Sequence, residues 1–409
     1  MKKLLIIGFV WPEPKSSAAG TRMMQLIMLY LEMDYEITFV STAQNISFSA
    51  NLNIYKIKTV QIVLNDSSFD DFCYELQPDI VLFDRFLTEE QFGWRVASVC
   101  ANAIRILDTE DLHSLRLARQ KAVKENREFT KNDLLISEIA KREIASIYRC
   151  DLSLMVSEYE IALLQEIFSV PKFLIYYLPI TVQSIIENTI EFNDRENFVF
   201  IGNFLHEPNY DAVKFLSDNI WNGIHELLPN AKMNIYGAYP MQKLTELNNP
   251  KKHFYIRGRA ENASEIIKKS RVILAPIRFG AGIKGKLLEG MECGTPSITS
   301  TVGSESMHGS LPWNGFICDD DDDFIKKSAL LYQDESTWRF AKKNGYDLIK
   351  NRYLKALFET SFKQKIKDLE HNYAQFRLKN FTGILLMHHT ANSTKYMSKW
   401  IEEKNKKPL

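Results

Sequence analysis

Apolar runs of strand length alternate with segments of helical periodicity along most of the chain, and this alternation limits the fold more than any other feature. In the first part of the sequence we expect strands at residues 4–9, 35–40, 80–83, 103–107, 152–156 and 173–178. Helical segments lie between them, among them 21–32, 111–124 and 132–148. The runs are continuous in Ile, Leu and Val, as is typical of parallel strands that helices cover on both faces. The sequence therefore predicts a doubly wound α/β fold.

The same pattern starts again after a polar stretch at residues 187–196. The second series has expected strands at 197–201, 232–236, 253–256, 272–275 and 297–300, and expected helices at 210–228, 241–247, 263–269 and 286–293. We therefore expect two Rossmann-like domains that face each other across a cleft, residues 1–185 and 196–365, followed by a C-terminal extension, residues 366–409.

The first residues allow two interpretations. The apolar run 4–10, followed by the small residues 16–20, resembles a short signal peptide. The alternative is a buried strand, a loop that contains Gly20, and the helix 21–32. We favour the strand, because together with the next strand it forms a complete βαβ unit.

Composition excludes several classes of protein. Lys and Arg together number 51, as do Asp and Glu, and this zero net charge argues against general nucleic-acid binding. No apolar run approaches the roughly 20 residues that span a bilayer. The five cysteines have no C-x-x-C spacing, which argues against a zinc site and a disulfide framework. We expect a protein of a reducing compartment, the cytoplasm.

Two polar segments each have a functional and a structural interpretation. Five consecutive aspartates at 319–323 are a metal site or a helix N-terminus, and we favour the latter because the following residues have helical periodicity. Residues 371–409 carry seven basic residues against two glutamates, together with Phe381, Tyr396 and Trp400. Peripheral contact with the inner face of a membrane is one interpretation of this tail. A solvated tail or a packed appendage is the other, and we favour it.

The segment 275–296 is the most informative for chemistry. It leaves an expected strand, crosses a loop that contains Gly280, Gly282 and Gly285, and enters an expected helix. Glycines allow backbone N–H groups to approach a ligand closely, and a helix start adds partial positive charge. The sequence therefore predicts an anion site here.

Charged side chains in the same segment suit a nucleotide. Arg278, Lys284 and Lys286 add positive charge next to the expected anion site. Lys286 and Glu289 are three residues apart and share a helix face, which places a cation for phosphate beside a carboxylate for sugar hydroxyls. The alternative is a solvated Lys–Glu pair.

The segment 280–296 resembles the nucleotide-sugar motif of retaining GT-B glycosyltransferases of the large group 1 family. Residues 200–204 and 255–259 are similar to strand ends in the C-terminal half of that family. Ser157-Glu158 and Leu178-Pro179 lie where the family ends its N-terminal half, so that the resemblance covers about residues 1–365. It implies transfer of a sugar from a UDP- or GDP-type nucleotide sugar to a hydroxyl of a glycan or lipid-linked acceptor, with retention at the anomeric carbon. The product would be a bacterial-type surface or envelope glycan, and the resemblance implies no metal or other cofactor.

The resemblance also implies roles for individual residues. Glu289 would bind the donor ribose, and Gly237 and Arg259 would border the nucleobase. The diphosphate would be held by Arg278, Gly280, Ala281, Gly282, Lys284 and Lys286. The N-terminal domain would bring the acceptor, with Asp111 and His113 as catalytic candidates. The candidates for the sugar and acceptor side are Gly20, Arg22, Asp84 and Arg85.

Some of these N-terminal candidates also have a purely structural interpretation. An aspartate before a helix is a common N-cap, and a single histidine is often structural. The role of Asp111 and His113 therefore stays open at this point.

The sequence departs from the family at two places. Ala281 stands eight positions before Glu289, where many members have a glutamate that contacts the transferred sugar. The usual Arg and Lys after the first C-terminal strand are also absent, and residues 202–208 stand there instead. A nucleotide-sugar epimerase or phosphorylase of the same fold, or a non-catalytic binding subunit, therefore remains an alternative. A dehydrogenase is disfavoured, because no G-x-G-x-x-G follows the first strand.

Overall fold

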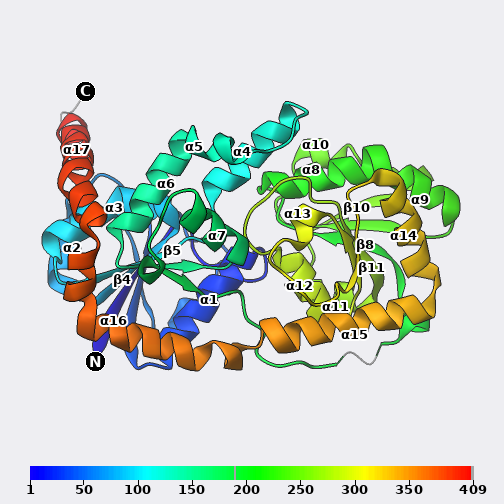
Figure 1. Cartoon of the computed structure of the whole chain (residues 1–409), viewed down its shortest axis with the longest axis horizontal. Coiled ribbons are helices and arrows are strands. Elements are labelled where there is room, and N and C mark those ends of the chain that lie inside the picture. The colour runs from blue at the N-terminus through cyan, green and yellow to red at the C-terminus, as the bar shows by residue number, and fades with distance from the viewer. Residues whose placement is uncertain (188–189, 407–409) are drawn as a thin grey trace.

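The structure is a computed structural model that describes residues 1–187 and 190–406, except for the side chains of residues 389–392. Within these residues two parallel sheets form, one of seven strands and one of six, and helices cover both (Figure 1). The expected α/β class with two Rossmann-like domains is confirmed. Residues 188 and 189 of the polar stretch and residues 407–409 of the tail, Lys407 among them, lie outside the described residues.

The N-terminal sheet has the strand order β3-β2-β1-β4-β5-β6-β7. Its strands are β1 (Lys2–Gly8), β2 (Tyr35–Ser41), β3 (Lys58–Gln61), β4 (Ile80–Asp84), β5 (Ile104–Asp108), β6 (Leu152–Met155) and β7 (Ile175–Tyr177). Leu4 in β1 pairs with Ile37 in β2 on one side and with Ile80 in β4 on the other, and it is fully buried. The interpretation of the first residues as a central strand is therefore confirmed.

Seven helices of the described residues surround this sheet before the chain leaves it: α1 (Ala18–Leu31), α2 (Ser68–Leu76), α3 (Arg85–Val99), α4 (His113–Lys124), α5 (Lys131–Leu135), α6 (Glu138–Arg149) and α7 (Glu158–Glu166). Local caps set several of their starts, since Ser17 accepts a hydrogen bond from the backbone of Gly20 at the start of α1. The single helix expected over 132–148 is instead two helices. The break occurs because Ser137 caps a new start by accepting from the backbone of Ala140.

The C-terminal sheet has the order β10-β9-β8-β11-β12-β13. Its strands are β8 (Glu196–Ile201), β9 (Met233–Tyr236), β10 (Phe254–Gly258), β11 (Ser270–Ala275), β12 (Ser297–Thr299) and β13 (Gly315–Ile317). Its helices are α8 (Glu207–Phe215), α9 (Trp221–Leu227), α10 (Gln242–Thr245), α11 (Ala263–Lys269), α12 (Gly285–Glu292), α13 (Thr301–Ser304), α14 (Asp321–Gln333) and α15 (Glu335–Arg352). Asp320 caps α14 by accepting from the backbone of Asp323, which confirms the helix-start interpretation of the aspartate run.

Two strands, β3 and β13, were not expected from the sequence. Each lies at the edge of its sheet and is at most four residues long. Both are only partly buried, so that neither needs the continuous apolar run by which the central strands are found.

After α15 the chain returns to the N-terminal domain as α16 (Glu359–Lys379) and α17 (Phe381–Lys406). Phe362, Ile366 and Leu369 of α16 are buried in the core beneath β1. The expected boundary at residue 365 therefore falls inside a helix that already belongs to the N-terminal domain. Helix α17 stands upright against α3 and α6 at the end of this domain (Figure 1). Over residues 1–187 and 190–406, every helix is too short or too polar to cross a bilayer.

Candidate active site

The site lies where the two domains meet. Their contacts come from loops at the carboxyl ends of parallel strands, which is where open α/β sheets bind ligands. The Tyr239 hydroxyl, after β9, lies 2.9 Å from the Glu13 carboxylate, after β1. Glu160, after β6, accepts a hydrogen bond from the backbone of Gly282, after β11. The expected cleft is thus closed by direct contacts at several points.

The loop between β11 and α12 is shaped by its glycines. Gly282 has a φ of +64°, a left-handed conformation that favours glycine. A Cβ on Gly282 would lie 3.0 Å from the Cβ of Asp111 in the other domain. A Cβ on Gly285 would lie 2.6 Å from that of Ala18, so that the start of α12 faces the start of α1 across the domain boundary. Both glycines therefore allow the domains to approach.

Two lysines beside this loop have lowered pKa values. Lys284 is buried, and its ammonium group donates to the Gly282 carbonyl oxygen at 2.9 Å. Burial lowers its pKa to about 8. Burial and the neighbouring Lys284 lower the pKa of Lys286 to about 7, and the ammonium group of Lys286 bonds the side-chain oxygen of Asn209. An anion that binds here would stabilise the charged form of both lysines, because a nearby opposite charge offsets the cost of burial.

The other predicted donor-side groups divide into two. Glu289 is half-buried on α12 and accepts from the Ser264 hydroxyl at 3.1 Å, and burial raises its pKa. Arg278 instead turns toward α8, where its Nε lies 2.9 Å from Asp211. Lys284, Lys286 and Glu289 therefore lie together at or just before α12, whereas Arg278 forms an ion pair with Asp211 of α8.

Glu160 is a residue that the sequence interpretation did not single out. It is fully buried at the start of α7, and its Oε1 accepts from the backbone N–H of Gly282 at 2.6 Å and of Leu112 at 3.2 Å. Among the described residues its Oε2 has no hydrogen-bond partner. Burial and Asp111 raise the pKa of Glu160 to about 8, against the two amide hydrogen bonds that lower it. The amide of Gly282, which we expected to face the diphosphate, is thus occupied by a carboxylate in the closed cleft.

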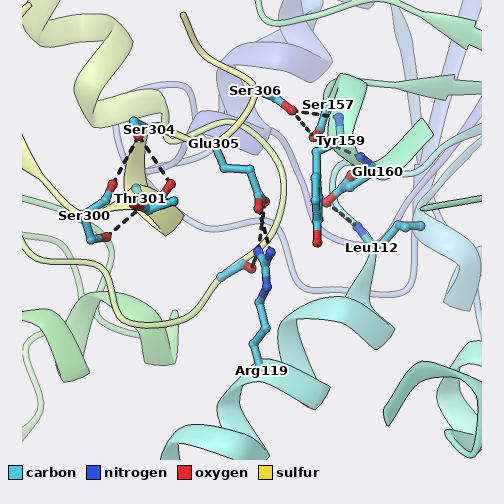
Figure 2. A network of polar contacts seen from close by, with 12 residues as sticks. Leu112, Arg119, Ser157, Tyr159, Glu160, Ser300, Thr301, Ser304, Glu305 and Ser306 are labelled. Atoms are coloured by element: carbon cyan, nitrogen blue, oxygen red, sulfur yellow. Dashed lines mark hydrogen bonds and ion pairs between the residues drawn. The ribbon is translucent and has the colours of Figure 1, made fainter. Parts of the chain in front are cut away.

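Arg119 on α4 forms a further link across the cleft (Figure 2). Its guanidinium donates to both carboxylate oxygens of Glu305, at 2.9 and 2.6 Å, and to the Gly280 carbonyl oxygen at 2.9 Å. Ser306 adds another link, since its hydroxyl accepts from the backbone of Tyr159 at 2.7 Å. Ala281 packs against the N-terminal core between these links.

Asp111 and His113, the catalytic candidates, lie together after β5. The Arg116 Nε lies 2.8 Å from one carboxylate oxygen of Asp111, and the His113 Nε2 lies 3.4 Å from the other. Burial alone would raise the pKa of Asp111, but Arg116 and His113 outweigh it and lower the pKa. Burial lowers the pKa of His113 to about 4, so that its imidazole is neutral near pH 7. A charged carboxylate beside a neutral imidazole can accept and donate hydrogen bonds to sugar hydroxyls.

Three of the four residues predicted for the sugar and acceptor side make close contacts within the N-terminal domain. Arg22 is buried, and its guanidinium lies 2.8 Å from Asp108 and donates to the backbone of Leu178. Asp84 is buried and accepts from the backbone of Phe9 at 2.9 Å. A Cβ on Gly20 would lie 2.3 Å from the backbone of Glu13, so that this glycine permits close packing. Arg22 and Asp84 thus bond groups of their own domain, whereas Gly20 lies in the first turn of α1 beside Glu13, at the domain boundary.

The fourth residue, Arg85, has a φ of +69°, and its guanidinium lies 5.1 Å from the centre of the half-exposed Phe9 ring. Glu110, at the end of the next strand, also has a left-handed φ, +62°. Burial, Asp108 and Asp84 raise the pKa of Glu110 well above its usual range. Left-handed residues at two adjacent strand ends are typical of functional sites, a signal that only the backbone provides.

On the expected nucleobase side the N-terminal domain covers the C-terminal one. The guanidinium of Arg259 lies 3.9 Å from the centre of the Phe48 ring, which also contacts Tyr239 edge to face. A Cβ on Gly237 would lie 2.1 Å from the Gly202 carbonyl oxygen, so that Gly237 is required for packing. Gly258 has open space around its Cα and a φ of +74°. The open space beside Arg259 thus lies at Gly258 and not at Gly237.

Among the described residues, no three His, Cys, Asp or Glu side chains are grouped closely enough to hold a metal ion.

Comparison with protein families identifies the second domain. Residues 195–334 match the family described as "Glycosyl transferases group 1". The C-terminal domain is a group 1 glycosyltransferase domain. The matched range covers the loop 276–284, Lys286 and Glu289, and the resemblance seen in the sequence is confirmed. A comparison with curated protein sequences finds no match.

Solved structures share the fold of the whole glycosyltransferase. Sucrose-phosphate synthase from Thermosynechococcus elongatus is 14% identical, with a TM-score of 0.67, over 90% of this chain and 99% of that one. The pneumococcal O-GlcNAc transferase GtfA, in complex with UDP and GlcNAc, is 12% identical, with a TM-score of 0.65, over 90% and 99%. Anabaena HepE in complex with UDP is 10% identical, with a TM-score of 0.63, over 90% and 100%. The chain therefore has the expected GT-B fold of glycosyltransferases over both domains.

Proposed function

We propose that this glycosyltransferase transfers a sugar from a nucleoside-diphosphate sugar to a hydroxyl of a glycan or lipid-linked acceptor, with retention at the anomeric carbon. The observation that carries the proposal is the pair Lys284 and Lys286 at the start of α12. Burial lowers the pKa of both, and Glu289 lies on the same short helix. Two adjacent lysines at a helix start favour a ligand with two adjacent negative charges, and a half-buried carboxylate favours a neighbouring diol.

The proposed chemistry is a substitution on one face of the sugar. The bond between the anomeric carbon and the diphosphate oxygen breaks, and a bond from the acceptor oxygen to the same carbon forms. The proton of the acceptor hydroxyl passes to the leaving diphosphate oxygen. Negative charge grows on the diphosphate in the transition state, so that Lys284 and Lys286 stabilise the transition state more than the bound donor. Asp111 and His113 orient the sugar from the opposite domain, and no metal or other cofactor enters the scheme.

We infer a uridine donor from the structural relatives. HepE and GtfA are each described in complex with UDP, and GtfA also with GlcNAc. The open space at Gly258, beside Arg259, suits the base of such a donor. The five cysteines of this chain are buried thiols, which fits a cytoplasmic enzyme that makes the precursor of a surface or envelope glycan.

The decisive experiment measures nucleotide binding. We expect UDP to raise the melting temperature more than GDP, ADP, CMP or dTDP. Lys286→Ala and Glu289→Ala should lose this shift, whereas Lys251→Ala should keep it, because Lys251 is exposed at the opposite end of the sheet, before β10. A wild-type protein that binds no nucleoside diphosphate would contradict the proposal.

The missing carboxylate at Ala281 favours a second candidate, a binding subunit without turnover. Incubation with UDP-sugars and a panel of acceptors separates the two, since the binding subunit would hold UDP and release none from the donor. A nucleotide-sugar epimerase would convert the donor with no acceptor present, so that an acceptor-free control tests that alternative in the same assay.

A further inference from the structure

Helix α17 turns most of its large apolar side chains away from the domain that it packs against, toward solvent. The face toward the domain is mostly small or polar, although it also holds the half-buried Met387, whose sulfur lies 3.9 Å from the Arg105 guanidinium. It includes Gly383, whose Cβ would lie 2.2 Å from the Tyr148 carbonyl oxygen, and the buried Ser398, which donates to Asn65 at 3.0 Å. Glu402 on this side pairs with Arg95 of α3. The helix is thus attached by close backbone approach and polar bonds.

The opposite face of α17 carries large apolar side chains in solvent. Phe381 is 71% exposed, Leu385 48%, Tyr396 68% and Trp400 60%. Their spacings of four, eleven and four residues place them on one side of a helix with 3.6 residues per turn, as two pairs with the polar His388 between them. Met397 lies beside the stripe and completes a shallow hollow, lined by Ser393, Tyr396, Met397 and Trp400. No other segment of the described chain covers this stripe.

The charges around the stripe are positive. Lys379, Lys395, Lys399, Lys404 and Lys406 lie on α17 or just before it. Of the two glutamates in α17, Glu402 is bound to Arg95, and Glu403 lies 3.0 Å from Lys406. The Lys404 ammonium group lies 5.4 Å from the centre of the Trp400 ring. A surface partner would therefore meet apolar and aromatic groups flanked by more lysines than carboxylates.

We propose that this stripe, the side chains of Phe381, Leu385, Tyr396 and Trp400 with the flanking lysines, binds the surface of an anionic lipid bilayer. Tyr and Trp prefer the boundary between headgroups and acyl chains, and lysines beside them pair with lipid phosphates. A second copy of the chain fits less well, because it would place lysines opposite lysines around the same stripe. The inference goes beyond the proposed function, since it concerns where the enzyme is held and not the transfer. It also reverses our preference for a tail that serves only as a packed appendage.

The geometry leaves the active site independent of this contact. Helix α17 packs on α3 and α6, at the end of the N-terminal domain, while the loop 276–284 contacts α4 and α7 (Figure 1). Lipid binding at α17 would hold the domain that receives the acceptor close to a membrane without covering the cleft.

The test uses the full chain and two kinds of vesicle, phosphatidylcholine alone and phosphatidylcholine with 30% phosphatidylglycerol, in a co-sedimentation assay. We expect binding to the anionic vesicles to be at least tenfold tighter, and to weaken as salt is raised. Tyr396→Ser with Trp400→Ser should weaken it at least tenfold. The matched control is Phe340→Ser on α15, an equally exposed aromatic residue of the other domain, 62% exposed, which should bind vesicles as the wild type does.

Two results would overturn the proposal. One is equal binding of the wild type to both kinds of vesicle, or equal binding of the double variant and the wild type to the anionic ones. The other is a concentration-dependent dimer in sedimentation velocity that the double variant abolishes, which would make the stripe an interface between copies. UDP binding in vesicle-free solution should be the same for all variants, so that a failure of the proposed function would be seen separately.

Discussion

The ion pair of Arg119 with Glu305 joins the two domains, and we expect it to hold the cleft closed. The Arg119 side chain is 8% exposed and the Glu305 side chain 14%, so that solvent screens the pair little. The guanidinium makes two bonds to the carboxylate and one to the Gly280 carbonyl oxygen, all of 2.9 Å or shorter. Removal of one partner of a buried pair costs about 3–5 kcal/mol. The Gly280 bond survives in Glu305→Gln, so we take the low end, ~3 kcal/mol, or roughly a hundredfold in the ratio of closed to open molecules.

Single-molecule energy transfer between the domains measures this ratio. Lys141→Cys on α6 and Lys251→Cys before β10 offer exposed dye positions, and the five native cysteines are buried, so that dyes attach at the new sites. We expect the wild type to populate mainly one high-transfer state and Glu305→Gln to move molecules to a low-transfer state. Because each variant removes the same contact, the effects of Arg119→Met and Glu305→Gln should not add.

The matched control is Arg127→Met. Arg127 also forms a bidentate pair, with Asp133 at 2.8 and 2.9 Å, but both residues lie in the N-terminal domain and near its surface. This variant should leave the transfer histogram unchanged. If Glu305→Gln also leaves it unchanged, or if its effect simply adds to that of Arg119→Met, then the pair does not hold the domains together.

Three further predictions concern Lys286, the buried Arg22 and two glycines of the C-terminal domain. The pKa of Lys286 lies at about 7, so that its charge is lost as the pH rises from 6 to 8. The ratio of the wild-type affinity for UDP to that of Lys286→Gln should therefore fall over this range in calorimetric titrations. A constant ratio would place Lys286 outside the site. Arg22→Met leaves the buried Asp108 carboxylate without its cation. It should lower the free energy of unfolding in urea by about 3–5 kcal/mol and leave the affinity for UDP unchanged. An unchanged free energy of unfolding would contradict the structural role of Arg22. Gly315→Ala would place a Cβ 2.0 Å from the Ser297 carbonyl oxygen at a φ of +141° and should cost ~3 kcal/mol in the same assay. Gly280→Ala, whose nearest atoms lie at 3.7 Å, should cost less than ~0.5 kcal/mol, and equal losses for the two variants would contradict the packing argument.

The sequence predicts the parts of this fold that depend on local patterns. The central strands have continuous apolar runs because helices cover both of their faces, and β1 and β11 were found in this way. The edge strands β3 and β13 were missed because their residues are half-exposed and need no such run. The helix start at Gly285 could be expected because its loop glycines and lysines are adjacent in the sequence.

The candidate site is less predictable because its partners are far apart in the chain. Ser157 and Glu160 have the spacing of a capping box, in which the glutamate bonds the backbone of its own helix start. Glu160 instead bonds Gly282, which lies 122 residues further along the chain. Arg22 was expected to face the acceptor, but its guanidinium is buried and bonds Asp108, which lies 86 residues further along the chain. Local sequence patterns predict neither of these two partners.

The absence of a glutamate at position 281 and the presence of Glu160 belong to one arrangement. Ala281 is small and apolar, so that it packs against the N-terminal core and lets Gly282 come within 2.6 Å of the Glu160 carboxylate. A glutamate at 281 would bring a second carboxyl group into a region where burial and Asp111 already raise the pKa of Glu160 to about 8, and the same burial would disfavour the charge of the added group. In the function that we propose, the diphosphate is held by the groups that Glu160 leaves available, the start of α12 with Lys284 and Lys286. That proposal places the anion site a few residues beyond Gly282, while a carboxyl group from the other domain occupies the Gly282 amide.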